Sequence, residues 1–216
     1  MKNNEIVIKN PEGEDEIQQA QLAEYAAWEF IGMEKEQLDI RPVYNLFKEG
    51  FFTAYLDGKG IGNIETFKLK YDLEAKDFPT WAEITKNGTG QTHDPDGDIL
   101  YVLSLGVDPN YRGMQLGQKL VEAVKVRCVE LNLKCVALGC RVPDYHKHSD
   151  VDINEYITLK RPDGEFLDSE LRFYSRCGLK FKKVLPEYMS GENADEESLN
   201  FGVLSIWENP NYKGGE

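Results

Sequence analysis

The fold is decided by ILYVLSLGV (residues 99–107), followed by DPNYRGMQLG (108–117) and an amphipathic run to Leu131. The first segment is apolar, with one small polar residue at Ser104, which is typical of a strand buried on both faces. The proline and its Asp and Asn neighbours end that strand, because proline cannot donate to a β-ladder. Apolar residues at helical spacing then predict a helix that begins at once; they are Leu116, Leu120, Val121, Val124, Cys128 and Leu131.

The start of this helix has no capping side chain. No Ser, Thr, Asp or Asn stands just before Gln115 and Leu116, so the first backbone N–H groups have no side-chain acceptor. Arg112 and the flexible Gly113 and Gly117 occupy the turn instead. Bare N–H groups at a positive helix end bind anions, most often phosphates, so we expect a diphosphate site; an ordinary glycine-containing turn is the alternative.

Two common phosphate loops are excluded by spacing. Gly117 is followed by Gln118 and Lys119, which does not complete a P-loop, and the Gly-x-Gly-x-x-Gly spacing of dinucleotide-binding proteins is absent.

The segments before this unit predict a mixture of strands and helices. In order, they are an edge strand (5–9), a helix (12–30) with Ile17, Leu22, Tyr25 and Trp28 on its apolar side, two helical pieces (34–49) separated at Pro42, and two strands (51–56 and 60–69) turning at Asp57-Gly58. Gly32 is expected to end the first helix. Residues 71–98 have no clear period and are expected to form a long loop, in which Trp81 and His93 favour packing.

The segments after it predict a second strand and a last helix. Residues 134–142 form an apolar strand, parallel to the first because a helix joins them. A second long loop (143–164) precedes a helix at 167–177, with Asp168 or Ser169 at its cap and Gly178 just past its end. Two antiparallel strands (179–185 and 201–207) complete the order.

Composition narrows the class of protein. The 216 residues carry a formal net charge of −13, which argues against nucleic acid or an anionic membrane as partner. No apolar run is long enough to span a bilayer, and no signal-peptide pattern is present, so we expect one cytoplasmic domain (1–216). The four cysteines form no Cys-x-x-Cys pair and are interpreted as core thiols. The Asp94-Asp96-Asp98 and His146-x-His148 patterns fit metal loops poorly, and no metal is expected.

The central loop resembles the acetyl-CoA loop of the GNAT acetyltransferases. The matching residues are Val107, Pro109, Tyr111, Arg112, Gly113 and Gly117, while Gln115 stands where the family more often has glycine. The segment from Arg172 to Leu179 resembles the Phe-Tyr-x-x-x-Gly-Phe segment of the family's last helix. This resemblance implies an α/β (α+β) fold with a mixed sheet of about seven strands, a splayed parallel pair and flanking helices.

A narrower likeness is to the acetyltransferase-like domain that is fused to nitrilase-type hydrolases. The segments that match it are 81–85, 89–93, 139–146, 185–188 and 207–210. The tyrosine of the last helix is often replaced in that subgroup, so its presence at Tyr174 favours transfer chemistry.

The resemblance implies an enzyme that transfers acetyl from acetyl-CoA to an amine by direct attack. It implies Tyr174 as the general acid that protonates the thiolate, and His93 or His146 is our candidate for the base. Residues expected to contact acetyl-CoA are Leu105, Gly106, Val107, Arg112, Gly113, Met114, Gln115, Leu116 and Gly117. Gly106 is expected to mark a bulge or a close approach. The acceptor is a small-molecule or protein amine, and members of the family often form homodimers. A non-catalytic acyl-CoA-binding regulatory module is the alternative.

Overall fold

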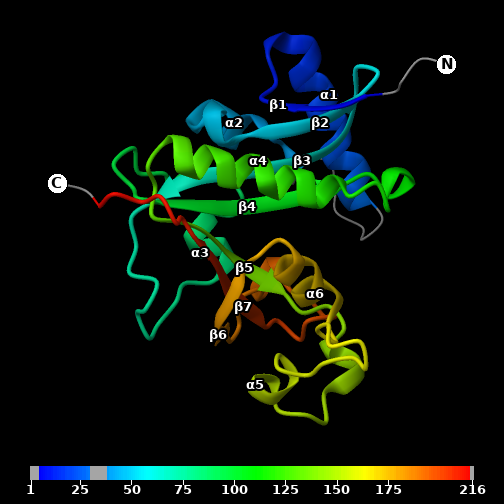
Figure 1. Cartoon of the computed structure of the whole chain (residues 1–216), viewed down its shortest axis with the longest axis vertical. Coiled ribbons are helices and arrows are strands. Elements are labelled where there is room, and N and C mark those ends of the chain that lie inside the picture. Colours follow the sequence, from blue (N-terminus) through cyan, green and yellow to red (C-terminus); the bar gives the residue numbers. More distant parts are fainter. Residues whose placement is uncertain (1–4, 30–37, 215–216) are drawn as a thin grey trace.

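A seven-stranded mixed sheet runs through the protein in a computed structural model that describes residues 5–29 and 38–214 (Figure 1). Its strand order is β1-β2-β3-β4-β5-β7-β6, and only the β4–β5 pair is parallel. The strands are β1 (Ile6–Lys9), β2 (Phe52–Leu56), β3 (Lys59–Leu69), β4 (Ile99–Val107), β5 (Cys135–Arg141), β6 (Lys180–Leu185) and β7 (Gly202–Glu208). This architecture confirms the predicted fold class.

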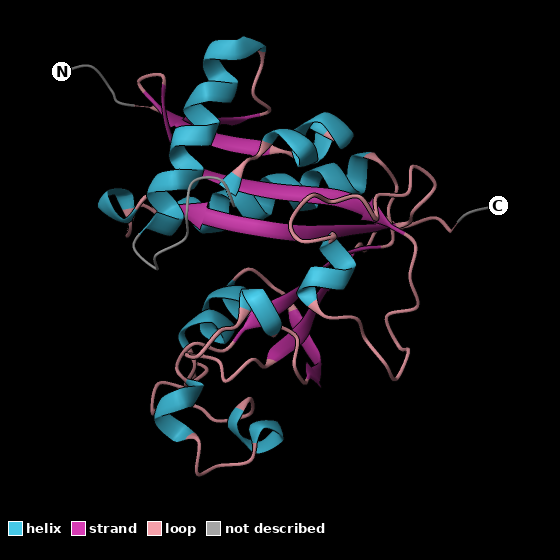
Figure 2. Cartoon of the chain, turned by 180° about the vertical axis from the view of Figure 1, so that it is seen from behind, coloured by secondary structure: helices cyan, strands magenta, loops and turns pink. Residues whose placement is uncertain are grey.

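Helices cover both faces of the sheet. They are α1 (Gly13–Trp28), α2 (Arg41–Leu46), α3 (Trp81–Thr85), α4 (Leu116–Glu130), α5 (Ile153–Tyr156) and α6 (Ser169–Arg176). Helix α4 lies in front of the sheet in Figure 1, whereas α1 and α3 lie in front in the reverse view of Figure 2. Helices α4 and α6 contribute to one hydrophobic core with strand residues such as Leu100 and Leu138. None of the helices in the described ranges is long and apolar enough to cross a membrane.

The parallel pair separates soon after it begins. Strand β4 pairs with β5 only from Ile99 to Tyr101, and the two strands then diverge. On the other side of β4, the register with β3 shifts so that Leu103 is an extra residue between Val102 and Ser104. Because side chains alternate along a strand, this bulge changes which residues face each layer. Ser104 consequently faces α1 rather than α4.

Several local predictions are confirmed. Pro42 lies in the first turn of α2, and Asp57 and Gly58 form the hairpin turn with positive φ angles. Asp168 caps α6, and Gly178 follows that helix with a φ of +84°. All four cysteines are buried and free. The expected end of the first helix at Gly32 lies outside the described residues.

Three predictions are corrected. The segments 71–98 and 143–164 contain the short helices α3 and α5, although both were predicted as loops. Helix α3 begins with a reciprocal capping box between Thr80 and Glu83, which stabilises a helix too short to show a period. In α1, Leu22 is exposed, and the buried face carries three alanines and an acid: Ala20, Ala23, Glu24 and Ala27. Small residues are buried there because the helix lies close to β3 and β4.

Candidate functional site

The first turn of α4 is uncapped and open to solvent. Gln115 occupies its N-cap with a φ of +59°, and its side chain makes no capping hydrogen bond. Gly113 has a φ of +84°, and a Cβ added to it would meet nothing within 4 Å. Residues 112–115 are all exposed, with Met114 at 40%. The N–H groups of residues 116–118, which have no acceptor among the residues that the structure describes, and the helix dipole together make this turn suited to an anion. Gln115 thus keeps the left-handed backbone that a glycine adopts most readily.

Helix α6 packs directly against this turn. A Cβ added to Gly117 would lie 3.0 Å from the ring of Phe173, so glycine allows the close approach. The ring of Phe173 is in turn 4.8 Å from that of Tyr174, edge to face. The structure therefore links the predicted anion turn to the helix of the predicted general acid.

A hollow of about 310 Å³ lies beside the turn, between α4 and the end of α6. Its lining includes Gln115 and three basic side chains, Lys119, Lys125 and Arg176, together with Glu122, which pairs with Lys125 at 2.8 Å. In a chain of net charge −13, this is a locally basic surface next to the exposed amides. Such a surface is suited to further phosphate groups.

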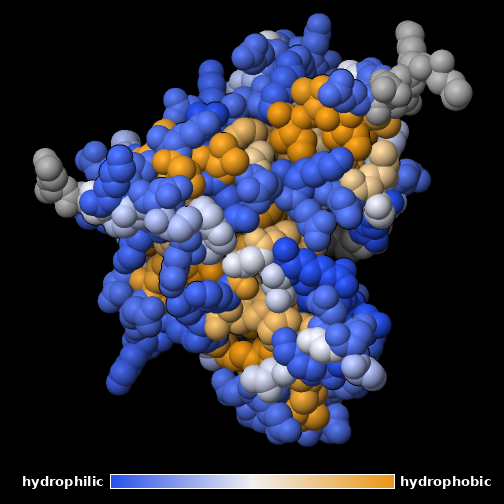
Figure 3. Space-filling model, in the orientation of Figure 1, coloured by the Kyte–Doolittle hydropathy of each residue, from blue (hydrophilic) through white to orange (hydrophobic). Residues whose placement is uncertain are grey.

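The divergence of β4 and β5 leaves a strand edge without a β-ladder. No strand in the described part of the chain continues the ladder on the β5 side of β4 beyond Tyr101. At the point of separation, the Tyr101 hydroxyl accepts from the Gly139 N–H at 3.2 Å and bonds to the Tyr188 hydroxyl at 2.7 Å. Hydrophobic and weakly polar surface lies between the two halves of the sheet in Figure 3. This edge is available to an extended ligand that has backbone-like amides.

Gly106 marks a close approach rather than a bulge. A Cβ there would lie 2.7 Å from the Cβ of Ala27, so its absence lets α1 pack on β4. The bulge is three residues earlier, at Leu103, whose carbonyl accepts from the Trp81 indole at 3.3 Å. Gly106 is therefore needed to place α1 against the strand.

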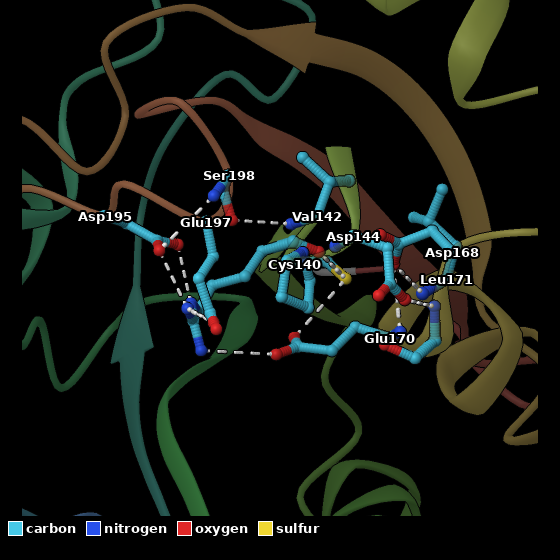
Figure 4. Close-up of polar contacts among 12 residues, drawn as sticks. Cys140, Val142, Asp144, Asp168, Glu170, Leu171, Asp195, Glu197 and Ser198 are labelled. Carbon is cyan, nitrogen blue, oxygen red and sulfur yellow. Dashed lines mark hydrogen bonds and ion pairs between the residues drawn. The ribbon is translucent and has the colours of Figure 1, made fainter. Parts of the chain in front are cut away.

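An ion-pair cluster surrounds the end of β5, next to α6 (Figure 4). Arg141 donates to Asp195 at 2.6 and 2.8 Å, to Glu197 at 3.1 Å, and lies 3.7 Å from Glu170. Glu170 also lies near the Cys140 thiol. Burial raises the pKa of Glu170 to about 7, against the lowering effect of Arg141. We name Arg141, Glu170, Asp195 and Glu197 the Arg141 cluster.

Tyr174 lies on the same face of α6 as Glu170, one turn along. Its side chain is buried, and burial followed by the charge of Glu170 raises its phenolic pKa well above the ordinary value. A phenol of ordinary pKa, about 10, also keeps its proton at neutral pH, so this rise makes Tyr174 a weaker acid.

The first candidate base, His93, lies near the start of β4. The Nδ1 atom of His93 accepts from the Lys68 N–H at 3.1 Å, and its ring stacks on Phe47. Lys68 pairs with Leu100 near the start of β4, roughly 16 Å along the strand from Leu105. His93 thus has structural contacts at the opposite end of the strand from the uncapped turn.

His146 is exposed in the loop after β5. Its Nδ1 lies 2.9 Å from the Pro143 carbonyl and 3.1 Å from that of Glu197. Because both neighbours only accept, Nδ1 carries the hydrogen and Nε2 is the atom left to act as a base.

Two buried acids beneath the β4 bulge were not predicted as site residues. Glu24 is 3% exposed on α1, and Glu65 is 4% exposed on β3, directly opposite Ser104. The Glu24 carboxylate accepts from Trp28 at 2.7 Å, Ser104 at 2.9 Å and Asn63 at 3.2 Å. A charged residue at the spacing of Ala20 and Ala27 was the signal that could have identified Glu24.

Comparison with known families identifies the chain. The profile of the Acetyltransferase (GNAT) family matches residues 15–149, which is more than half of the sequence. The chain belongs to the GNAT family. Its members are acyltransferases, and the solved aminoglycoside 6'-N-acetyltransferase with this fold is in complex with coenzyme A.

Two Bacillus subtilis (strain 168) proteins are relatives of this GNAT protein. "Uncharacterized N-acetyltransferase YkwB" is 33% identical over 168 residues, covering 77% of this chain and 72% of the relative. "Probable hydrolase YhcX" is 33% identical over 167 residues, but these are only 32% of its length. The second match is consistent with the predicted likeness to GNAT domains fused to hydrolases.

Solved structures show the same fold. The loading GNATL domain of CurA from Lyngbya majuscula has a TM-score of 0.78 at 23% identity, covering 95% of this chain and 98% of that one. The GphF GNAT-like decarboxylase in complex with isobutyryl-CoA has a TM-score of 0.73 at 19% identity, covering 94% and 98%. The ribosomal-protein-S18-alanine N-acetyltransferase from Escherichia coli has a TM-score of 0.52 at 13% identity, covering 98% and 97%.

Proposed function

We propose that the protein transfers an acetyl group from acetyl-CoA to an amine. The observation that supports this most strongly is the uncapped, exposed N-terminus of α4 beside a strand edge that has no β-ladder partner. A diphosphate and an extended amide arm are the two chemical features of coenzyme A that these elements suit. Family membership supports the same reaction class.

In this proposal, the backbone of residues 112–117 binds the diphosphate, and Arg112 adds positive charge. The backbone of Leu105 and Val107 pairs with the pantetheine arm, near Gly106. The basic hollow lined by Lys119 and Arg176 suits the phosphate of the nucleotide end.

The chemistry follows from the thioester. The amine nitrogen, after it loses a proton, attacks the carbonyl carbon, and the carbon–sulfur bond breaks. The departing thiolate takes a proton from Tyr174, because a phenol is protonated at neutral pH. In this proposal, His93 or His146 is the candidate for the base that takes the proton from the amine.

The general acid is tested by Tyr174→Phe. We expect kcat to fall by about 10²-fold, the lower end of the usual range for a general acid, while the Kd for coenzyme A stays unchanged. Tyr145→Phe is the matched control, because it removes another buried hydroxyl, one that donates to the Val151 carbonyl. Equal loss of rate and coenzyme A affinity in Tyr174→Phe would contradict the assignment.

The overlap with a GNAT-like decarboxylase suggests a second candidate, loss of CO₂ from a carboxyacyl-CoA. Incubation with acetyl-CoA and an amine panel, or with malonyl-CoA alone, separates the two activities by release of free coenzyme A or of CO₂. Binding of coenzyme A with neither product would instead support a non-catalytic acyl-CoA-binding module.

A further inference from the structure

Two buried tyrosines lie at the point where β4 and β5 separate (Figure 1). Tyr101 is the last residue of β4 that pairs with β5, and its hydroxyl accepts from the N–H of Gly139, two residues beyond its β5 partner, at 3.2 Å. This hydroxyl replaces the β4 carbonyl that a continuing ladder would supply. The Tyr188 hydroxyl lies 2.7 Å from it, and the exposed fractions of Tyr101 and Tyr188 are 0% and 2%. The two hydroxyls therefore occupy the place where the ladder would continue.

The fold leaves space for the ring of Tyr188 at two glycines. A Cβ added to Gly139 on β5 would overlap this ring, and one added to Gly202 on β7 would lie 2.6 Å from it. The Trp81 N–H donates to the Tyr188 carbonyl at 2.7 Å, and the Trp81 indole donates to the Leu103 carbonyl at 3.3 Å. Helix α3 thus holds both the tyrosine and the bulge of β4.

The tyrosine pair lies where the acyl group of a bound thioester would end. In the proposed function, the pantetheine arm runs from the first turn of α4 past Val107 and Leu105. Leu103 is two residues beyond Tyr101 on β4, as Gly139 is beyond the partner of Tyr101 on β5, so the hydroxyls lie level with the bulge. The four residues from there to Val107 contain about twelve backbone bonds, roughly the number in the pantetheine arm. An arm bound in this way brings the thioester to the tyrosine pair.

We propose that Tyr188, held by Tyr101, closes the acyl end of the coenzyme A site and limits the acyl group to acetyl. This inference rests on the proposed function and deepens it by naming the acyl group that the site accepts. Neither side chain can rotate away without breaking the hydrogen bonds that join the two tyrosines and Gly139. Each further methylene of a longer acyl chain would meet the Tyr188 side chain, and a closely packed interior accepts it only with strain.

The test compares the binding of acetyl-CoA and butyryl-CoA by calorimetry, with no acceptor amine present. The wild-type protein should bind butyryl-CoA at least about tenfold more weakly, because its two extra methylenes have no space. Tyr188→Ala removes the ring, so the ratio of the two affinities should shift toward butyryl-CoA by at least about tenfold, as expected for burial of two methylenes. Tyr156→Ala removes another buried tyrosine, in α5, and is the matched control whose ratio should equal that of the wild type.

A second variant keeps the test decisive if loss of the ring prevents folding. Tyr188→Phe retains the ring and removes only the hydroxyl, so the affinity for propionyl-CoA relative to acetyl-CoA should rise by about fourfold, as expected for one methylene. The thermal midpoint and the affinity for free coenzyme A report whether each variant is folded, and the affinity for free coenzyme A should be unchanged. Where Tyr188→Ala folds, its ratio decides the test; otherwise the ratio of Tyr188→Phe decides it.

The outcomes separate this inference from the proposed function. If the wild-type protein binds acetyl-CoA and butyryl-CoA equally well, or if the deciding Tyr188 variant leaves the ratio unchanged, the acyl limit is wrong. The tyrosine pair is then only a wedge between the strands, and the proposed function stands. If coenzyme A itself does not bind to the wild-type protein, the proposed function fails and the acyl limit fails with it.

Discussion

The protein holds two groups of acids, the Arg141 cluster at the end of β5 and the pair Glu24 and Glu65 beneath the β4 bulge. They differ in whether a described residue of the chain supplies a cation. In the Arg141 cluster, the chain supplies the cation, because the guanidinium of Arg141 contacts Asp195, Glu197 and Glu170. Beneath the β4 bulge, Glu24 and Glu65 are more deeply buried, and no described residue supplies a cation. The first group lies on β5, α6 and the loop before β7, and the second lies on α1 and β3.

The acids of the Arg141 cluster are compensated within the chain, whereas Glu24 and Glu65 have no compensating cation among the described residues. Buried charges are tolerated when they are paired, and removal of one partner leaves the others uncompensated. The Arg141 cluster meets that condition and ties β5 to the loop that carries Asp195. The Glu24–Glu65 pair does not, so its balance depends on a proton or on a ligand. Substitution of Arg141 should therefore destabilise the protein, whereas substitution of Glu65 should not.

The largest expected effect is that of Arg141→Met. It leaves Asp195 buried without its cation, so we expect the free energy of unfolding to fall by about 3 kcal/mol, the lower end of the range for breaking a buried pair. Urea unfolding measures it. Arg161→Met removes an exposed arginine and should cost little. If the free energy of unfolding falls no more in Arg141→Met than in Arg161→Met, the claim that Arg141 compensates the buried charge of Asp195 is wrong.

The next effect distinguishes the two acids of the bulge. Glu24→Gln places an amide opposite three donors, and we expect a loss of about 1–2 kcal/mol in the free energy of unfolding. Glu65→Gln removes no hydrogen bond to the described residues and should leave stability unchanged or higher. The same urea titrations compare the two variants, and equal losses would show that the charge does not reside on Glu24.

The smallest effect is a pH dependence within the Arg141 cluster. Because the folded pKa of Glu170 is raised from its ordinary value of 4.5 to about 7, the folded state binds more protons than the unfolded state between these values. The stability contributed by Glu170 is therefore full below about pH 4.5 and is lost as pH rises through 7. Glu170→Gln should flatten this decline in thermal midpoint between pH 5 and about 8, with Glu192→Gln as control. An unchanged slope in Glu170→Gln would contradict the raised pKa.

Much of the fold could be predicted because local chemistry determines it. Asp108-Pro109 ends β4, the uncapped helix follows, and the parallel β5 comes from the connection between them. Helix α3 was missed because its stability comes from the Thr80–Glu83 capping box rather than from a hydrophobic period. Sequence patterns of five or fewer residues carry too little periodicity to distinguish a helix from a loop.

The sequence did not reveal that Glu24 and Glu65 are buried beneath the β4 bulge. Leu22 and Trp28 defined the predicted apolar side of α1, whereas the buried side is built from small residues and Glu24. Likewise, Glu65 shares one face of β3 with Asn63 and Phe67. Only the register between β3 and β4 shows that Glu65 lies beside Ser104. The candidate site depends on contacts between segments about 40 and 80 residues apart, which single-sequence periods do not contain.

The account depends most on the diphosphate site at the first turn of α4. Calorimetry of coenzyme A against pantetheine, which lacks the diphosphate and the nucleotide, tests it most directly. We expect coenzyme A to bind at least about tenfold more tightly, with amide chemical shifts of residues 113–117 moving only for coenzyme A. Equal affinities, or no change at those amides, would contradict the central claim.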